Sequence, residues 1–238
     1  MVAGVSRALG SRKRFDGVFV GGPPCQPFSV AASQRFSKSG ENYKRVGFAH
    51  SKNGNLLFNY LALVQQFMPR AVLIENVPGL GDIDGGDQLA RAVSRLESWG
   101  YFVVDPAVLN AADYEVPQFR KRLFVIAFRS RAAGLRFALP APKKPYLTVD
   151  GALRGIRAGA VNHETREHSA ASVMRYMRLN LGQRDHLGRV DRLSPYQPSK
   201  TIIAGGTAGG GRSHLHPHIP RTLSVRESAR LQTFPDWT

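Results

Sequence analysis

The chain has 238 residues, enough for one large domain or two small ones, and its 42% hydrophobic content supports a packed core. No apolar run is long enough to span a membrane, and the short stretch before Arg12-Lys13-Arg14 does not resemble a signal peptide, so we expect a cytoplasmic protein. A single cysteine excludes a disulfide within the chain.

The net charge of +16 is very unevenly distributed. Residues 1–119 hold 12 Lys and Arg against 10 Asp and Glu, a balance of +2, whereas residues 120–238 account for +14. Six of the seven histidines also lie in the second half. A basic half joined to a nearly neutral one is typical of a protein that binds a phosphate backbone with one region. The alternative is a solvated basic surface without a partner.

The first predicted element is a strand over residues 15–21, apolar on both faces, that ends at a run carrying the only cysteine: Gly21-Gly22-Pro23-Pro24-Cys25-Gln26-Pro27-Phe28-Ser29. Because prolines fix φ and restrict the residue before them, this loop is stiff and holds Cys25 in one direction. We therefore expect a nucleophile at the carboxyl end of a strand, where open α/β sheets bind their ligands. The alternative is a small buried hydrophobic residue.

Alternating strands and helices follow a long polar loop over residues 30–53. The apolar spacing predicts helices at 56–68 and 88–99 and strands at 71–74, 101–104 and 123–128. This order predicts a doubly wound sheet with parallel crossovers. The strand at 71–74 delivers Glu75 at its end, so Cys25 and Glu75 should face one crevice. A surface carboxylate is the alternative for Glu75.

Two arginines precede the last of these strands, in the run Gln118-Phe119-Arg120-Lys121-Arg122. At positions i and i+2 of a strand, Arg120 and Arg122 would point the same way. The alternative is a solvated charge run.

A composition break at residues 140–145, rich in Pro and Lys, predicts an interdomain hinge. Residues 146–220 are basic and short on regular periodicity. The glycine-rich run 205–211 lacks the Lys-Ser/Thr ending of a phosphate loop, so we expect it to let backbone approach a ligand. His214, His216 and His218 have no Cys or carboxylate beside them, and we predict no metal site. Ser224-Val225-Arg226-Glu227 forms a capping box that opens a helix through Leu231.

Four segments together resemble the DNA (cytosine-5) methyltransferase family, and the resemblance covers residues 4–236. They are Gly22-Pro23-Pro24-Cys25-Gln26-Pro27-Phe28-Ser29, Glu75-Asn76-Val77, Gln118-Phe119-Arg120-Lys121-Arg122 and Arg226-Glu227-Ser228-Ala229-Arg230-Leu231-Gln232-Thr233-Phe234-Pro235. The resemblance implies an α/β, Rossmann-like methyltransferase sheet that lacks its first strands, with a small basic target-recognition region. We expect a partial catalytic domain at 1–140, a DNA-binding region at 146–220, and a helix at 221–238 that returns to the catalytic domain.

The resemblance also implies roles for individual residues. The Cys25 thiolate would add to C6 of a cytosine flipped out of double-stranded DNA, so that C5 can take a methyl group from S-adenosylmethionine. Glu75 would contact N3 and Arg122 would contact O2, with Arg120 nearer the backbone. The expected substrate or DNA contacts are Gln26, Ser29, Asn76, Pro78, Gln118, Gly210 and Arg212, with Asn76 and Pro78 also shaping the Glu75 loop.

The chain departs from the family pattern in its cofactor-binding segments. The Phe-x-Gly-x-Gly turn and two acidic residues that hold S-adenosylmethionine upstream are missing, as are the closing segment and final helix, and only Pro24 and Leu56 resemble cofactor neighbours. The family topology would leave residues 16–21 as an exposed apolar edge. We therefore expect a fragment of a longer reading frame, or one half of a split enzyme that a second chain completes.

The resulting hypothesis is a cytosine-C5 methyltransferase of restriction-modification or phage type, associated with the nucleoid of a prokaryotic or phage-infected cell. Two alternatives stay open at this stage. One is the tRNA-methylating branch of the same family, which the basic stretch before the last motif disfavours. The other is a catalytically silent nucleic-acid-binding remnant.

Overall fold

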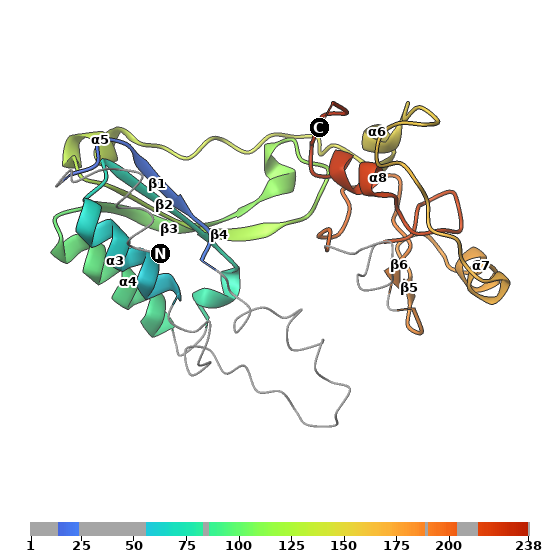
Figure 1. Cartoon of the computed structure of the whole chain (residues 1–238), viewed down its shortest axis with the longest axis horizontal. Coiled ribbons are helices and arrows are strands. Elements are labelled where there is room, and N and C mark those ends of the chain that lie inside the picture. Colours follow the sequence, from blue (N-terminus) through green and yellow to red (C-terminus); the bar gives the residue numbers. More distant parts are fainter. Residues whose placement is uncertain (1–13, 24–55, 83–85, 189, 204–213, 238) are drawn as a thin grey trace, which may run out of the picture. The chain divides into compact units, whose positions relative to one another are not determined.

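The computed structural model describes residues 14–23, 56–82, 86–188, 190–203 and 214–237. The chain divides into two compact units (Figure 1). Unit 1 comprises residues 1–109 and 121–140, and unit 2 comprises residues 110–120 and 141–238. The expected boundary near residue 140 coincides with one of the crossings between the units, while residues 110–120 group with the basic unit.

Unit 1 is built on a four-stranded mixed sheet in the order β1-β2-β4-β3. The strands are β1 (Val18–Gly21), β2 (Ala71–Asn76), β3 (Phe102–Asn110) and β4 (Lys121–Phe128). β1 and β2 are parallel, with Gly21 opposite Ile74, and β2 and β4 are antiparallel. The parallel neighbours β1 and β2 agree with the predicted crossover. The expectation of consecutive parallel strands does not hold for β3, because β4 lies between β2 and β3.

Helices α3 (Leu56–Phe67) and α4 (Asp87–Ser98) lie side by side on one face of this sheet (Figure 1). Alternate residues of β2 and β4 point into the core beneath them, in the pattern that a half-buried strand requires. The core residues of this layer include Leu61, Val64, Val72, Ile74, Leu96, Leu123, Val125 and Ala127. Short helices η4 (Pro78–Leu80) and α5 (Arg131–Arg136) complete the described part of unit 1.

Strand β1 is apolar on both faces, as predicted, but it is not buried on both. Phe19 packs against the core, while Val18 and Val20 on the opposite face are 57% and 69% exposed. This outcome fits the expected apolar edge better than the expected buried strand.

The core of unit 1 contains two tyrosines whose hydroxyls differ in their bonding. Tyr101 donates its hydroxyl to the carbonyl of Pro69 at 2.7 Å, whereas the buried Tyr60 hydroxyl has no hydrogen-bond partner among the described residues. Burial raises the pKa of both groups. A buried hydroxyl without a partner costs free energy that a bonded one recovers.

Tyr60→Phe is therefore expected to leave unit 1 as stable as the wild type or up to about 1 kcal/mol more stable, while Tyr101→Phe should cost about 1 kcal/mol. Chemical denaturation of the two variants measures the difference. Equal destabilisation by both changes would show that the Tyr60 hydroxyl is bonded in solution.

Unit 2 has short elements joined by long irregular segments, as its weak periodicity predicted. The helices are η6 (Ala111–Tyr114), α6 (Val149–Leu153), α7 (Ala170–Met177) and α8 (Val225–Arg230), and β5 (Arg184–Asp185) pairs antiparallel with β6 (Val190–Asp191). The predicted capping box is present at the start of α8. This helix packs against α6 and groups with unit 2, whereas the sequence led us to expect it to return to the domain of residues 1–140.

The predicted hinge is held within unit 2 by residues of the 110–120 segment. Lys143 donates its backbone N–H to the carbonyl of Asp113 at 2.7 Å, and the Asp113 carboxylate accepts from the Tyr146 hydroxyl at 2.8 Å. Lys144 Nζ lies 2.9 Å from the centroid of the Tyr146 ring. Residues 143–146 are therefore a fixed part of unit 2.

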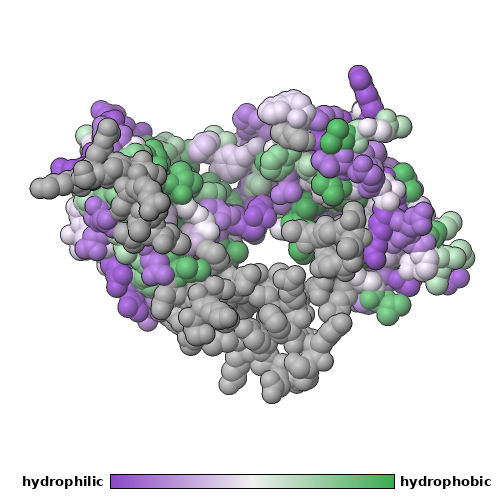
Figure 2. Space-filling model, viewed as in Figure 1, coloured by the Kyte–Doolittle hydropathy of each residue, from purple (hydrophilic) through white to green (hydrophobic). Residues whose placement is uncertain are grey.

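The visible face of unit 2 mixes hydrophilic residues with scattered hydrophobic ones (Figure 2). Exposed apolar side chains on this unit include Met174, Met177, Leu187 and Tyr196. Of the described helices, none combines the length and the hydropathy needed to cross a membrane.

Candidate functional site

The Glu75 and Arg122 side chains meet on the face of the sheet opposite to α3 and α4. Glu75 pairs with Phe124 across β2 and β4, and Arg122 stands two residues from Phe124 on the same face. This diagonal places Arg122 Nε 2.8 Å from Glu75 Oε1. Arg122 also donates from its Nη1 to the carbonyl of Lys121 at 2.8 Å. The side chains are 19% and 36% exposed for Arg122 and Glu75, so the pair is reachable from solvent.

The start of the cysteine-bearing loop lies directly beside this ion pair. Gly22 follows β1 as Glu75 follows Ile74 in β2, because the two strands are parallel and in register. A Cβ added to Gly22 would stand 3.4 Å from Glu75 Oε2, and one added to Gly21 would stand 2.4 Å from the Tyr60 ring. The two glycines therefore permit a close approach of the loop to Glu75 and to α3. Cys25 follows Gly22 by three residues and lies outside the described residues, so the expected crevice is described only on its Glu75 side.

Asn76 and Pro78 shape the turn after Glu75. Asn76 is buried and its Oδ1 accepts the N–H of Val77 at 2.9 Å. Pro78 opens η4, where its fixed φ suits the first helical position and its missing N–H costs nothing. Their contact with substrate stays a prediction.

The remaining predicted site residues lie at the start of α3, just before β4, or outside the described residues. Leu56 opens α3 with a partly exposed side chain. Arg120 immediately precedes β4 and groups with unit 2, and its shared face with Arg122 stays a prediction. The residues Pro24, Cys25, Gln26, Ser29, Gly210 and Arg212 lie outside the described residues.

Gln118 is fully buried, with 0% of its surface exposed. Its Nε2 donates to the carbonyl of Leu231 at 3.4 Å, and its Oε1 accepts the N–H of Ile202 at 3.3 Å. This burial argues against the direct contact with DNA that the sequence predicts. The physical reason is that a buried backbone N–H or carbonyl without a partner costs free energy, and the Gln118 side chain removes this cost by bonding to Ile202 and Leu231.

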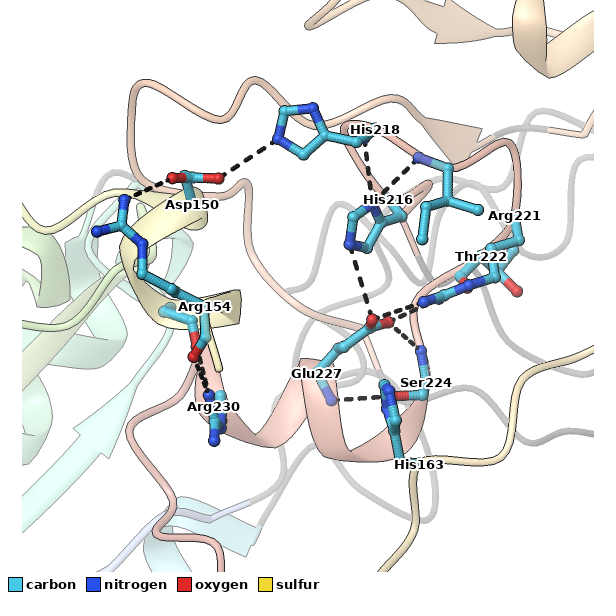
Figure 3. Close-up of polar contacts among 12 residues, drawn as sticks. Asp150, Arg154, His163, His216, His218, Arg221, Thr222, Ser224, Glu227 and Arg230 are labelled. Atoms are coloured by element: carbon cyan, nitrogen blue, oxygen red, sulfur yellow. Dashed lines mark hydrogen bonds and ion pairs between the residues drawn. The ribbon is translucent and has the colours of Figure 1, made fainter. Parts of the chain in front are cut away.

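A second polar cluster, centred on Glu227 of α8, lies in unit 2 (Figure 3). Arg221 donates both of its Nη atoms to the two Glu227 oxygens at 2.8 Å, and Ser224 donates its N–H to Glu227 Oε2 at 2.7 Å. Burial alone would raise the pKa of Glu227, but the hydrogen bonds from Arg221 and Ser224 outweigh it and lower the pKa. Glu227 is therefore a buried carboxylate kept charged by its partners.

The two arginines of α8 each join separate segments of unit 2. Arg226 is 1% exposed and donates to the carbonyls of Val161 and Pro235, at 3.0 Å each. Arg230 donates to the carbonyl of Arg154 at 2.7 Å and pairs with the Asp236 carboxylate. The sequence motif therefore fixes the fold of unit 2. Its capping box indicated the helix, but no local signal indicated these partners.

His216 is the histidine most strongly affected by its surroundings. Its Nδ1 accepts the N–H groups of His218 and Ile219 at 3.1 and 3.2 Å, so the proton of the neutral ring is on Nε2, which lies 3.8 Å from Glu227 Oε1. Burial lowers the pKa of His216 to about 4, although Glu227 opposes the shift. Burial also lowers the pKa values of His168 and His214. Among the described residues, no three His, Cys, Asp or Glu side chains lie together as a metal site would require.

The pKa of His216 makes the stability of unit 2 depend on pH. Unfolding returns the ring to its ordinary pKa of 6.5, so the unfolded chain binds the extra proton and stability falls as pH drops from 6.5 to about 4. His216→Asn, whose Oδ1 can take over the role of Nδ1, should flatten this dependence by roughly 3 kcal/mol. Urea denaturation at several pH values measures it, with the exposed His186→Asn as control. A slope that His216→Asn leaves unchanged would assign the dependence to other groups.

Comparison with known proteins now places the chain. A family model described as C-5 cytosine-specific DNA methylase matches residues 9–237. The chain belongs to this family. Among curated members, it is 31% identical to the type II methyltransferase M.PspPI of a Psychrobacter strain over 92% of this chain and 56% of that protein. It is 34% identical to M.HpaII of Haemophilus parainfluenzae, over 94% of this chain and 63% of that protein.

Solved structures agree with the family's fold. A crystal structure described as a DNA modification methyltransferase encoded within an E. coli prophage superposes with a TM-score of 0.72 at 23% identity, over 99% of this chain and 73% of that one. An Entamoeba histolytica methyltransferase gives 0.55 at 15% identity, over 92% and 66%. The sheet of unit 1 is thus part of a Rossmann-like methyltransferase fold. The chain spans a little over half the length of the first curated relatives that it matches, M.PspPI and M.NgoFVII of Neisseria gonorrhoeae.

Proposed function

We propose that this chain carries the base-binding and target-recognition parts of an S-adenosylmethionine-dependent DNA cytosine-C5 methyltransferase of restriction-modification or phage type. The observation that supports it most directly is the Glu75–Arg122 ion pair beside Gly22, three residues before Cys25, in a chain of this family. A carboxyl group and a guanidinium held 2.8 Å apart offer one acid–base group and one fixed cation to neighbouring atoms of a ring.

The reaction assigns each of these groups a task. The Cys25 thiolate adds to C6 of the flipped cytosine, which forms the S–C6 bond, pushes electron density from the C5–C6 double bond toward N3 and O2, and makes C5 nucleophilic. Glu75 hydrogen-bonds to N3 and passes it a proton as the adduct forms, and Arg122 neutralises the charge that develops on O2. After methylation the C5 proton passes to solvent, and the electrons of its C–H bond re-form the C5–C6 double bond as the S–C6 bond breaks and frees the Cys25 thiolate.

S-adenosylmethionine supplies the methyl group when it is bound. Of its expected neighbours only Leu56 is among the described residues, and an apolar side chain alone does not hold a ribose and a charged amino acid. The described residues therefore do not fit a complete site for this cofactor.

The exposed edge of the sheet favours the hypothesis that a further polypeptide segment completes the enzyme. In the described part of unit 1, β1 pairs with β2 on one side only, and Val18 and Val20 are largely exposed. An apolar edge of this kind is a template for strand pairing. We propose that the cofactor-binding segment, from the same reading frame or a second chain, pairs there.

Double-stranded DNA is the proposed substrate, held by unit 2 in the cytoplasm of a prokaryotic cell. The curated relatives carry the name type II methyltransferase, which favours DNA over tRNA. Several arginines of the basic half, among them Arg192, Arg221 and Arg226, bond within unit 2. Phosphate contacts would therefore come from the more exposed cations.

Covalent trapping tests this function. The chain, alone and with the polypeptide encoded directly upstream, is incubated with S-adenosylmethionine and duplex DNA that contains 5-fluorocytosine, which cannot lose the C5 substituent. We expect an adduct stable to denaturation that Cys25→Ala abolishes and that tRNA carrying the same base does not give. DNA binding without any adduct in either preparation would identify a silent nucleic-acid-binding remnant instead.

A further inference from the structure

Gln118 joins three segments of unit 2 that are far apart in sequence. Its backbone belongs to the segment that carries Arg120, its Oε1 accepts the N–H of Ile202, and its Nε2 donates to the carbonyl of Leu231. Leu231 caps the end of α8, where helix carbonyls lack partners of their own. Because the side chain is fully buried, no water replaces either bond when it is lost.

The segment that carries Gln118 and the segment of residues 199–202 are also joined through their backbones. Phe119 donates its N–H to the carbonyl of Ser199 at 2.8 Å, and Ser199 donates to the carbonyl of Pro117 at 2.9 Å, which forms a parallel bridge between Gln118 and Ser199. Thr201 adds a bond from its hydroxyl to the carbonyl of Phe119 at 2.8 Å. The backbone bridge fixes which residues of the two segments lie opposite each other. The bond from the Ile202 N–H to the Gln118 side chain extends the contact between the segments.

The segment that carries Arg120 is fixed in turn. Arg120 donates its N–H to Asn110 Oδ1 at 3.0 Å, and its carbonyl accepts the N–H of Ala111 at 2.9 Å. Thr201 is held on its other side, since its carbonyl lies 3.1 Å from Nε2 of the buried His214. Residues 199–202 and 118–120 therefore form one rigid body with the end of α8.

We propose that Gln118 is a positioning residue, whose amide holds residues 199–202 and the end of α8 in register with the segment that carries Arg120. Its effect on methylation rests on the proposed function. Both bonds of the side chain are made within unit 2, whereas Glu75 and Arg122 belong to unit 1, so its effect falls on which sequences are methylated rather than on the chemical step. Contacts that read bases need accurate placement, so a shift of the 199–202 segment weakens the distinction between sites.

Three variants of the full chain test the proposal. Gln118→Met keeps the length of the side chain and removes both bonds. Gln118→Glu keeps the acceptor for Ile202 and loses the donor to Leu231. Ser199→Ala is the matched control, because Ser199 is buried in the same bridge and its hydroxyl has no hydrogen-bond partner in the part of the chain that the structure describes.

The first measurement is hydrogen exchange at the Ile202 amide. We expect it to be at least tenfold faster in Gln118→Met, less affected in Gln118→Glu, and unchanged in Ser199→Ala.

The second measurement is bisulfite sequencing of a plasmid recovered from cells that lack other cytosine methyltransferases and express the chain with its upstream polypeptide. The quantity compared is methylation at preferred sites divided by methylation at sites that differ by one base. Gln118→Met should lower this ratio about tenfold. A loss of folded protein alone would lower both equally.

Two results would overturn the inference: wild-type exchange at Ile202 in Gln118→Met, or faster exchange with an unchanged ratio of sites. If Gln118→Met does not fold, Gln118→Leu, which also lacks both polar atoms, takes its place in both measurements. Exchange at Ile202 does not require methyl transfer. An inactive wild-type protein would therefore contradict the proposed function, while the exchange result would still decide whether Gln118 holds this segment.

Discussion

Glu75→Gln is expected to lower the rate of methyl transfer by about 10²–10⁴-fold, the range typical of lost proton transfer. Glutamine has the size of glutamate and its Oε1 can still accept from Arg122, so the arrangement of the site is kept. It cannot deliver a proton to N3, and it leaves the Arg122 charge without its counter-charge. Labelled methyl transfer to duplex DNA, with the completing polypeptide present, measures the effect.

The stability of the same variant separates chemistry from folding. Because Glu75 is 36% exposed, its ion pair contributes only about 0–1 kcal/mol to folding, and the unfolding midpoint should hardly move. Glu97→Gln, a neutralised carboxylate on the exposed surface of α4, is the control and should keep full activity. Activity of Glu75→Gln within threefold of the wild type would remove Glu75 from the proton-donating role.

The sequence was sufficient to predict the features that depend on neighbouring residues. Apolar runs bounded by Gly and Pro placed β1 and β2, and their parallel pairing places the ends of both strands at one edge. For that reason Glu75 and the start of the Cys25 loop are neighbours, as the order of strand and helix required. The capping box of α8 was also correct, because Ser224 and Glu227 satisfy each other's backbone groups locally.

The features that the sequence did not predict depend on partners far along the chain. Gln118 stands 84 residues from Ile202 and 113 from Leu231, and nothing in its own surroundings distinguishes a buried amide from one that faces DNA. The insertion of β4 between β2 and β3 is equally non-local. The alternation of apolar residues predicts that a segment forms a strand and which face it buries. It does not predict which other strand it pairs with.

The excess of positive charge has to be interpreted in the same way. Composition counts Arg226 with the surface arginines, but the structure makes it one of the most deeply buried side chains of unit 2. Arg192 likewise donates to the carbonyls of Leu179 and Pro217. A basic half can therefore reflect both an interface with phosphates and a fold that uses guanidinium groups to satisfy backbone carbonyls in irregular segments.

Glu227→Gln is expected to destabilise unit 2 by about 3–5 kcal/mol, the cost of leaving a buried charge without its partner. The glutamine retains an acceptor for the Ser224 N–H, but Arg221, whose side chain is 15% exposed, loses a bidentate carboxylate. Thermal and urea unfolding measure the loss. Arg154→Gln is the control: it breaks the exposed Arg154–Asp150 pair of the same unit, which should cost less than about 0.5 kcal/mol.

A double variant shows which part of this cost belongs to the interaction itself. Breaking a buried pair is expensive because one charge stays behind, whereas replacing both members with apolar residues of similar size is often neutral. Arg221→Met combined with Glu227→Leu should therefore be more stable than Glu227→Gln alone. The double variant could instead be as unstable as Glu227→Gln. In that case the Arg221–Glu227 pair contributes net stability to unit 2, and apolar packing does not compensate for the lost contacts of Glu227 with Ser224 and His216. Either result distinguishes a carboxylate that is merely kept charged from one on which the fold of α8 depends.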